Sequence, residues 1–148
     1  MKPVRLIMFT SALVFCLMQT GSAWACSCNA PVTTAEALNR STAVFRGRVV
    51  KITIPTFDWI GFTRTGAHRV TFQILSQWKG PFAETAVVVT RLTAEGCGFP
   101  FEEQKEYLVY VVAELKHTQT GICTGTKSIA DAEDEMEELD ELLLSPHK

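Results

Sequence analysis

The chain has 148 residues, with 14 Lys and Arg against 16 Asp and Glu, and 47% of its residues are hydrophobic. This length suffices for one domain with its own core, and the charge balance does not favour a nucleic-acid partner. No nucleophile elbow, H-E-x-x-H, P-loop or dinucleotide fingerprint occurs, so we do not expect an enzyme.

The first 25 residues have the pattern of a secretory signal peptide. Lys2 and Arg5 precede the apolar run Leu6–Met18, and Ala23-Trp24-Ala25 forms an A-x-A cleavage site. The run is too short for a comfortable membrane span. We therefore predict a signal peptide over residues 1–25 and one secreted or periplasmic domain over residues 26–148. Because the cut falls just before Cys26, a lipid anchor on that cysteine is the alternative.

Four cysteines remain after the predicted cut: Cys26, Cys28, Cys97 and Cys123. An even number in an exported chain predicts two disulfides. A Cys26–Cys28 bond would close a small strained ring, so two pairings stay open. In an extended segment these two cysteines point the same way, and both can reach the body of the domain. A redox role for the C-x-C pair is the alternative, and the two downstream cysteines favour structural disulfides over it.

The amino-terminal half of the domain predicts a helix and then a bent strand. Thr33 and Glu36 resemble a capping box that opens a helix over Thr34–Arg40. The segment Ala43–Ile54 alternates apolar and polar residues around Gly47, which predicts a half-buried strand with a bend or bulge. Turn-rich Pro55–Gly66 follows, and its aromatic residues 57–62 fit either a partner contact or packing over the end of the domain.

Three more strands and a final helix complete the predicted elements. The strands cover His68–Trp78, Thr85–Arg91 and Glu106–Glu114, and the helix covers Ser128–Ser145. An apolar stripe on this helix predicts its buried face: Ile129, Ala132, Met136, Leu139 and Leu143. Eight of the sixteen acids lie between Asp131 and Glu141, and we expect them on the opposite, solvated face.

These elements predict a mainly β fold with flanking helices. Five strands result if the long first strand bends and serves twice, or if the flanks of the aromatic segment pair. A small five-stranded barrel of the OB type is then the natural solution, and an open sandwich is the alternative.

Several motifs in this order resemble a known family. The C-x-C pair is followed by "VFRGRVV", "WKG", "CGFPFEEQKEYLVY" and a single Cys123 before a helix. Over nearly all of Cys26–Leu144 the chain is similar to the inhibitory domain of the tissue inhibitors of metalloproteinases (TIMPs) and to the wider netrin-like module, in a single-domain form. The resemblance implies a five-stranded Greek-key OB barrel and the disulfides Cys26–Cys97 and Cys28–Cys123.

The chain departs from that family in two respects. Members that inhibit animal proteases carry a third disulfide in this domain, and four cysteines leave room for only two. In addition, Gln104 stands where a glycine is common before the Tyr-Leu-Val-Tyr strand.

The resemblance also implies how the chain would act. The free α-amine and the carbonyl of Cys26 would chelate the zinc of a target metalloprotease and displace its water. Ser27 would enter the specificity pocket, and the remaining protease contacts would come from Cys28, Asn29 and Ala30 and from a second ridge of Glu95, Gly96, Cys97 and Gly98. The chain would hold no cofactor of its own, because the zinc belongs to the protease.

A second hypothesis keeps the same fold without inhibition. The chain would then be a non-inhibitory netrin-like module that binds a protein of the cell envelope or the extracellular space. Nucleic-acid binding by the barrel is a third class, which export and the net negative charge of −2 disfavour.

Overall fold

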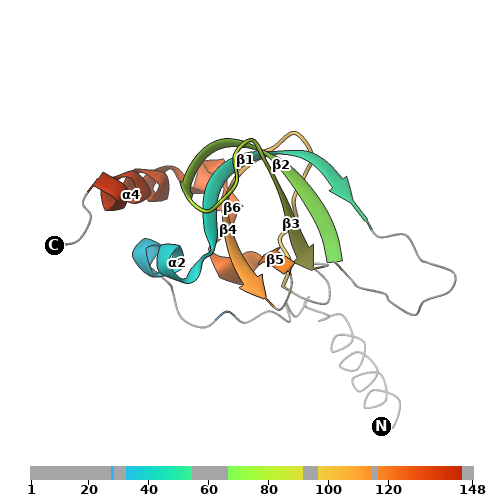
Figure 1. Cartoon of the computed structure of the whole chain (residues 1–148), viewed down its shortest axis with the longest axis horizontal. Coiled ribbons are helices and arrows are strands. Elements are labelled where there is room, and N and C mark those ends of the chain that lie inside the picture. The colour runs from blue at the N-terminus through green and yellow to red at the C-terminus, as the bar shows by residue number, and fades with distance from the viewer. Residues whose placement is uncertain (1–27, 29–32, 55–66, 92–96, 115–116, 145–148) are drawn as a thin grey trace, which may run out of the picture.

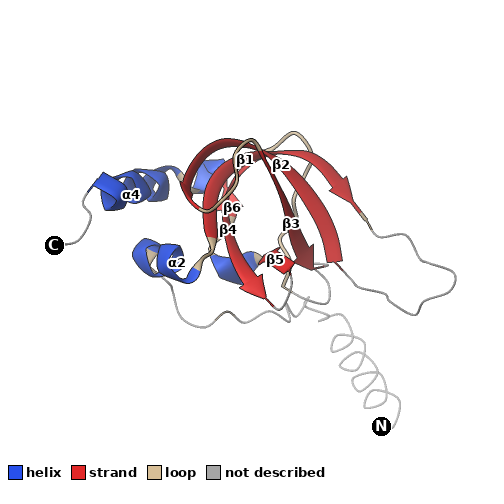
Figure 2. Cartoon of the chain, viewed as in Figure 1, coloured by secondary structure: helices blue, strands red, loops and turns tan. Residues whose placement is uncertain are grey.

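The computed structural model describes Cys28 and residues 33–54, 67–91, 97–114 and 117–144. Within these residues the chain forms a closed five-stranded β-barrel with two α-helices on its outside (Figures 1 and 2). The barrel strands are β1 (Ala43–Thr53), β2 (Ala67–Lys79), β3 (Thr85–Arg91), β4 (Glu106–Glu114) and β5 (His117–Thr120). The predicted signal peptide and the segment Pro55–Gly66 lie outside the described residues.

The barrel closes because β1 has a partner on each side. Neighbouring strands follow the order β1-β2-β3-β5-β4, and β4 then pairs with β1. Phe45 of β1, for example, lies opposite Gln77 of β2 and Val109 of β4. All pairings are antiparallel except that between β3 and β5. The two-residue strand β6 (Lys127–Ser128) pairs with β4 on the edge opposite to β1. The described part of the chain is therefore a barrel and not the alternative open sandwich.

The predicted elements agree closely with the observed ones. Helix α2 (Thr34–Arg40), β3 and β4 have the predicted bounds. Strand β1 ends one residue earlier than predicted, and β2 extends one residue further at each end. The predicted bend at Gly47 is also confirmed, because the β1–β2 register shifts between Arg46 and Gly47. A Cβ atom at Gly47 would lie 2.9 Å from the Phe45 ring, so the bend brings the strand against its own core.

Two predictions about the carboxy-terminal part were wrong. The fifth barrel strand is β5, which was not predicted. Strand β1 pairs with both β2 and β4, as one alternative required, but this double pairing closes the barrel and does not supply the fifth strand. The last helix α4 (Glu133–Leu144) begins five residues later than predicted. Ser128 pairs with Tyr107 of β4, and this extended backbone leaves room only for a 3-10 turn, Ile129–Asp131, before α4.

The barrel interior is an apolar core with a group of aromatic rings. Phe45 and Phe72 are fully buried and meet edge to face, with their ring centroids 5.5 Å apart. Phe101 extends this group, and its ring centroid lies 5.2 Å from that of Phe72 and 5.0 Å from that of Tyr107. The other buried core residues are Ala43, Val49, Val70, Ala86, Val88, Val109 and Val111.

A second apolar cluster joins the two helices to the outside of β1 and β4. Leu139 of α4 and Ala37 of α2 pack there against three buried barrel residues, Val44, Leu108 and Tyr110. Leu139 is fully buried, whereas Leu143, at the end of the predicted stripe, is 50% exposed. The predicted stripe therefore describes the docked face of α4 correctly only up to Leu139.

Acidic side chains of α4 also face the domain, which corrects the prediction that its acids are solvated. Glu135 accepts a hydrogen bond of 2.6 Å from the Tyr110 hydroxyl and pairs with Lys127. Asp140 accepts one of 2.6 Å from Trp78 Nε1. Burial and the neighbouring Glu135 raise the pKa of Tyr110 above its usual value, so this hydroxyl remains a donor. Polar contacts thus fasten a helix whose charges repel one another.

Candidate site at the disulfide-anchored end of the barrel

A disulfide fastens the amino-terminal segment to the end of the barrel. Cys28 is bonded to Cys123, 95 residues later, and their Cα atoms are 5.3 Å apart. Both cysteines are exposed. This bond confirms one of the two predicted pairings. Cys97 is also disulfide-bonded, and its predicted partner, Cys26, lies outside the described residues.

The turn that carries Cys123 is held by three threonines. Cys123 lies in a 3-10 turn, Ile122–Thr124, directly after β5. Thr120 and Thr126 are buried, and their hydroxyl oxygens are 2.6 Å apart. Thr124 donates to the carbonyl of Gly121 at 2.8 Å, and Thr126 accepts from the Tyr110 amide at 3.0 Å. The cysteine is therefore attached to a turn tied to the central strand β4.

Cys97 lies next to this turn. The amide of Ile122, one residue before Cys123, donates to the Cys97 carbonyl at 3.1 Å. The Phe99 amide donates to the Thr90 hydroxyl at 2.8 Å, which fixes residues 97–99 against the end of β3. The two cysteines that receive the predicted bridges thus sit side by side on adjacent pieces of backbone.

Gly98 allows this close packing. A Cβ atom there would overlap the carbonyl oxygen of Arg91, and one at Gly121 would overlap that of Cys97. Both glycines are buried. The absence of a side chain at Gly98 thus allows a close approach to Arg91 of the same chain, and this contact supports the ridge at Cys97 from within the domain.

The structure brings together those predicted site residues that it describes. Cys28, Cys97 and Gly98 all lie at one end of the barrel, near the end of β3 and the turn after β5 (Figure 1). Cys26, Ser27, Asn29, Ala30, Glu95 and Gly96 lie outside the described residues. The threonine cluster was not predicted, although the four threonines from Thr118 to Thr126, on both sides of Cys123, could have suggested it.

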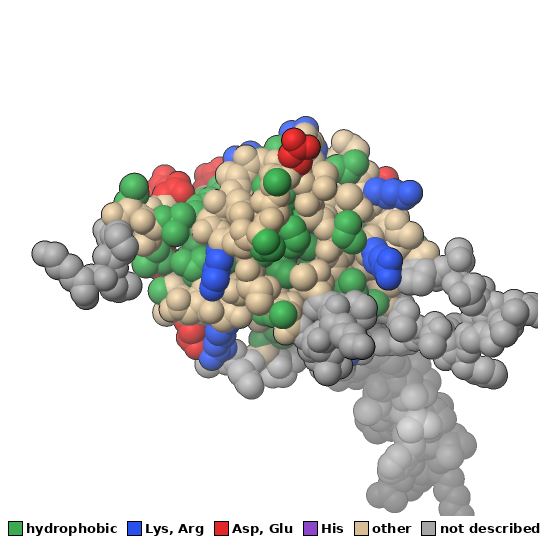
Figure 3. Space-filling model, viewed as in Figure 1, with side chains coloured by type: hydrophobic (Ala, Val, Ile, Leu, Met, Phe, Trp, Pro, Cys, Tyr) green, Lys and Arg blue, Asp and Glu red, His purple; other side chains and the backbone are tan. Residues whose placement is uncertain are grey.

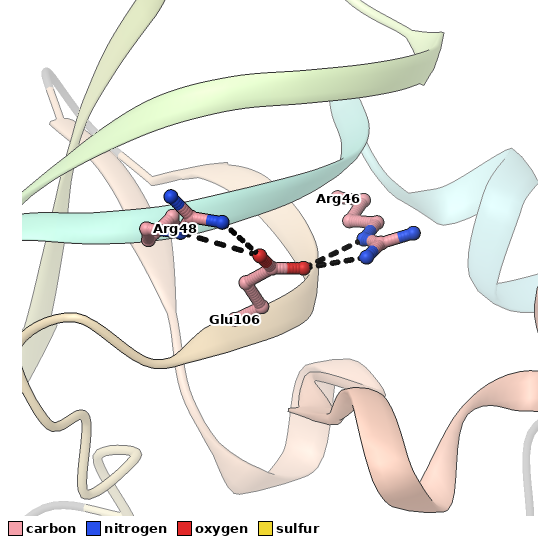
Figure 4. A network of polar contacts seen from close by, with 3 residues as sticks. All are labelled: Arg46, Arg48 and Glu106. Carbon is pink, nitrogen blue, oxygen red and sulfur yellow. Dashed lines mark hydrogen bonds and ion pairs between the residues drawn. The ribbon is translucent and has the colours of Figure 1, made fainter.

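A second polar cluster lies on the outside of the β1–β4 seam and was also not predicted. Glu106 of β4 accepts hydrogen bonds from Arg46 through one carboxylate oxygen, at 2.6 and 3.0 Å, and from Arg48 through the other, at 2.6 and 3.2 Å (Figure 4). These bonds from Arg48 and Arg46 hold the pKa of Glu106 below its usual value. Both carboxylate oxygens of Glu106 are thus engaged by arginines, and the cluster stabilises the β1–β4 pairing that closes the barrel.

Comparison with known proteins does not assign the chain to a family. No family model matches the chain, and no curated protein matches its sequence. Among the described residues, no helix is long and apolar enough to cross a membrane, and no three acidic, histidine or cysteine side chains are grouped so that they could hold a metal ion. The fold and the site define a class only: a disulfide-bonded, mainly β domain built on a closed five-stranded barrel.

Proposed function

We propose that this protein is a secreted inhibitor of zinc metalloproteases, with an OB-type barrel of the kind found in the TIMPs. The α-amine and the carbonyl of Cys26 would chelate the zinc of the target protease, and Ser27 would enter its specificity pocket. Cys28, Asn29 and Ala30 would continue along the cleft beside a ridge formed by residues 95–98.

The Cys28–Cys123 disulfide is the observation that carries this proposal. It places a covalent anchor two residues from the proposed chelating group. The anchor leads to a turn whose backbone is hydrogen-bonded to Cys97, the residue to which the resemblance assigns Cys26. A terminus held in this way would lose little conformational entropy on binding, which favours tight binding by a short segment.

The chemistry requires an unprotonated terminal amine. A catalytic zinc site keeps an open position for water, and a neutral amine with the adjacent carbonyl can occupy it as a five-membered chelate. The reference pKa of an α-amino group is about 7.7–8.0. Inhibition should therefore weaken as the pH falls below about 7, because the proton competes with the metal.

The test compares proteins that differ only at the terminus. The chain beginning at Cys26 is assayed against several zinc metalloproteases with fluorogenic peptide substrates, beside a variant with one added Ala before Cys26. The matched control carries the same Ala after Lys148. We expect the native terminus and the control to inhibit, and the amino-terminal extension to abolish inhibition.

Two results would refute the chelate. One is equal inhibition by the extended variant, and the other is a natural protein whose terminus, determined by mass spectrometry, is not a free Cys26. If the native terminus inhibits no metalloprotease, the non-inhibitory binding module becomes the better reading of this fold.

A further inference from the structure

Four acidic side chains of α4 have no partner within the chain. The other acids of this helix that face the domain contact Thr34, Trp78, Tyr110 or Lys127. The unpartnered acids are exposed, and within the described residues they make no hydrogen bond or ion pair: Glu133, Asp134, Glu137 and Glu141. Three of them follow one another at steps of three and four residues, so they form a stripe along one outward face of the helix. We call Asp134, Glu137 and Glu141 the acid stripe; at 1.5 Å per residue it is about 10 Å long.

Three basic side chains of the barrel are likewise without an acidic partner. Lys51 of β1, Arg69 of β2 and Arg91 of β3 are exposed, and no ion pair among the described residues includes any of them. Lys51 lies opposite Thr71, two residues from Arg69. Arg69 lies opposite Val89, two residues from Arg91. Diagonal neighbours on adjacent strands are about 7–8 Å apart, so these three cations form a row of roughly 15 Å, the cation row.

The acid stripe and the cation row are too far apart to neutralise each other within one chain. Trp78, near the end of β2, donates to Asp140 of α4, whereas Arg69 lies near the start of the same strand. At about 3.3 Å per residue, the strand between them covers roughly 30 Å. The Debye length at physiological salt is only about 8 Å, so the attraction between the two surfaces is screened. Figure 3 shows acidic side chains over α4 at the left and basic ones at the opposite edge of the barrel.

Exposed apolar side chains lie beside both charged surfaces. Leu144 follows Glu141 by one turn of α4 and is 83% exposed. Val50 precedes Lys51 at a register shift of β1 and is half-exposed. Val87 is an equally exposed residue of β3. The two surfaces therefore match in charge and also offer each other apolar contacts.

We propose that the chain associates with copies of itself, with the acid stripe of one copy lying along the cation row of the next. Leu144 then packs against Val50 and Val87. Three carboxylates meet three cations, and the long side chains of lysine and arginine cover the difference in length between the stripe and the row. This inference goes beyond the proposed inhibition and does not depend on it.

The geometry also determines the kind of assembly. The two surfaces are different patches at opposite ends of the molecule, with α4 at the left in Figure 1. A contact between different patches is heterologous, and it builds rings or open chains instead of a two-fold dimer. Exposed ion pairs are individually weak. We therefore expect association only at high protein concentration, and we expect salt to dissolve it.

The test measures sedimentation velocity of residues 26–148 over a range of protein concentrations. The row variant, Arg69→Glu/Arg91→Glu, reverses two members of the cation row. The stripe variant, Glu137→Lys/Glu141→Lys, reverses two members of the acid stripe. Thermal unfolding of each variant confirms that it is folded.

A matched control separates a specific contact from an effect of net charge. Arg40→Glu/Lys105→Glu changes the net charge as the row variant does, but it reverses two exposed cations that pair with acids elsewhere. The row and stripe variants are also measured as an equimolar mixture. In this mixture the intact cation row of the stripe variant can meet the intact acid stripe of the row variant.

We expect the unmodified protein to form a concentration-dependent series of species larger than a dimer at about 0.1 M salt. This series should disappear at about 1 M salt, where the Debye length is about 3 Å. The row variant and the stripe variant should each associate at least roughly tenfold more weakly, because two attractions become repulsions. The mixture should associate as the unmodified protein does, and so should the control.

Four outcomes would overturn the proposal. The first is a protein that stays monomeric at every concentration, because each surface would then have to meet a foreign partner. The second is association that persists in the row or the stripe variant or that stops at a dimer. The third is an equal loss in the control, and the fourth is a mixture that stays monomeric. None of these variants alters residues 26–30 or 95–98, so the result is independent of the chelate.

Discussion

Gln104 offers a direct test of how the chain accommodates a residue that the family pattern would replace by glycine. Its φ angle is +67°, in the left-handed region that side chains with a Cβ atom disfavour. Its amide nevertheless donates to the Val49 carbonyl at 2.8 Å, which ties the loop before β4 to β1. This hydrogen bond holds the backbone of residue 104 in the left-handed conformation. Because glycine adopts that conformation without strain, we expect Gln104→Gly to stabilise the protein.

The size of the gain follows from two opposing effects. The left-handed conformation costs a residue with a side chain roughly 1–2 kcal/mol. Glycine has more freedom in the unfolded chain, and this costs about 0.5–1 kcal/mol on folding. The Gln104 side chain is exposed, so its removal loses no burial energy. The net gain in the free energy of unfolding should therefore be roughly 0.5–1 kcal/mol. For a domain of this length, that corresponds to a rise in Tm of about 2–4 °C.

The assay is reversible urea unfolding of the oxidised protein, together with a thermal melt. Gln73→Gly is the matched control, because Gln73 is an exposed glutamine in the paired part of β2. This control should lose about 0.5–1 kcal/mol, since a glycine inside a strand brings only the entropic cost. If both variants are destabilised alike, the conformation at Gln104 is not strained and the reasoning fails.

Three further predictions concern packing, charge and the disulfide. Leu139→Ala should lower the free energy of unfolding by about 2–4 kcal/mol, while Leu143→Ala, at a half-exposed site on the same helix, should change it little in the same urea titration. Glu106→Gln should destabilise the protein above pH 5, and the difference from the unmodified protein should vanish as the pH falls through the lowered pKa of Glu106; an unchanged difference at pH 2 would contradict this. Cys28→Ser/Cys123→Ser should cost about 4 kcal/mol, because the bridge closes a long loop, and a loss below 1 kcal/mol would show that the amino-terminal anchor is unimportant for stability.

Local patterns in the sequence determined most of the elements. The capping residues of α2 and the alternation of apolar and polar residues in β1 to β4 depend on near neighbours, so their bounds were predicted within one residue. The spacing of Ala132, Met136 and Leu139 likewise identified the docked face of α4. The resemblance correctly implied the Cys28–Cys123 pairing, which residue spacing alone had left open.

Only the tertiary structure decided the features that depend on distant partners. The strand β5 is short and polar, and it becomes a strand because β3 and β4 lie on either side of it. Ser128 is extended and not helical because β4 offers it hydrogen bonds, and Glu135 faces inward because Tyr110 and Lys127 lie there. Contacts between residues so far apart in the chain leave no periodic pattern in the sequence, because the energy that selects them arises only when the barrel closes.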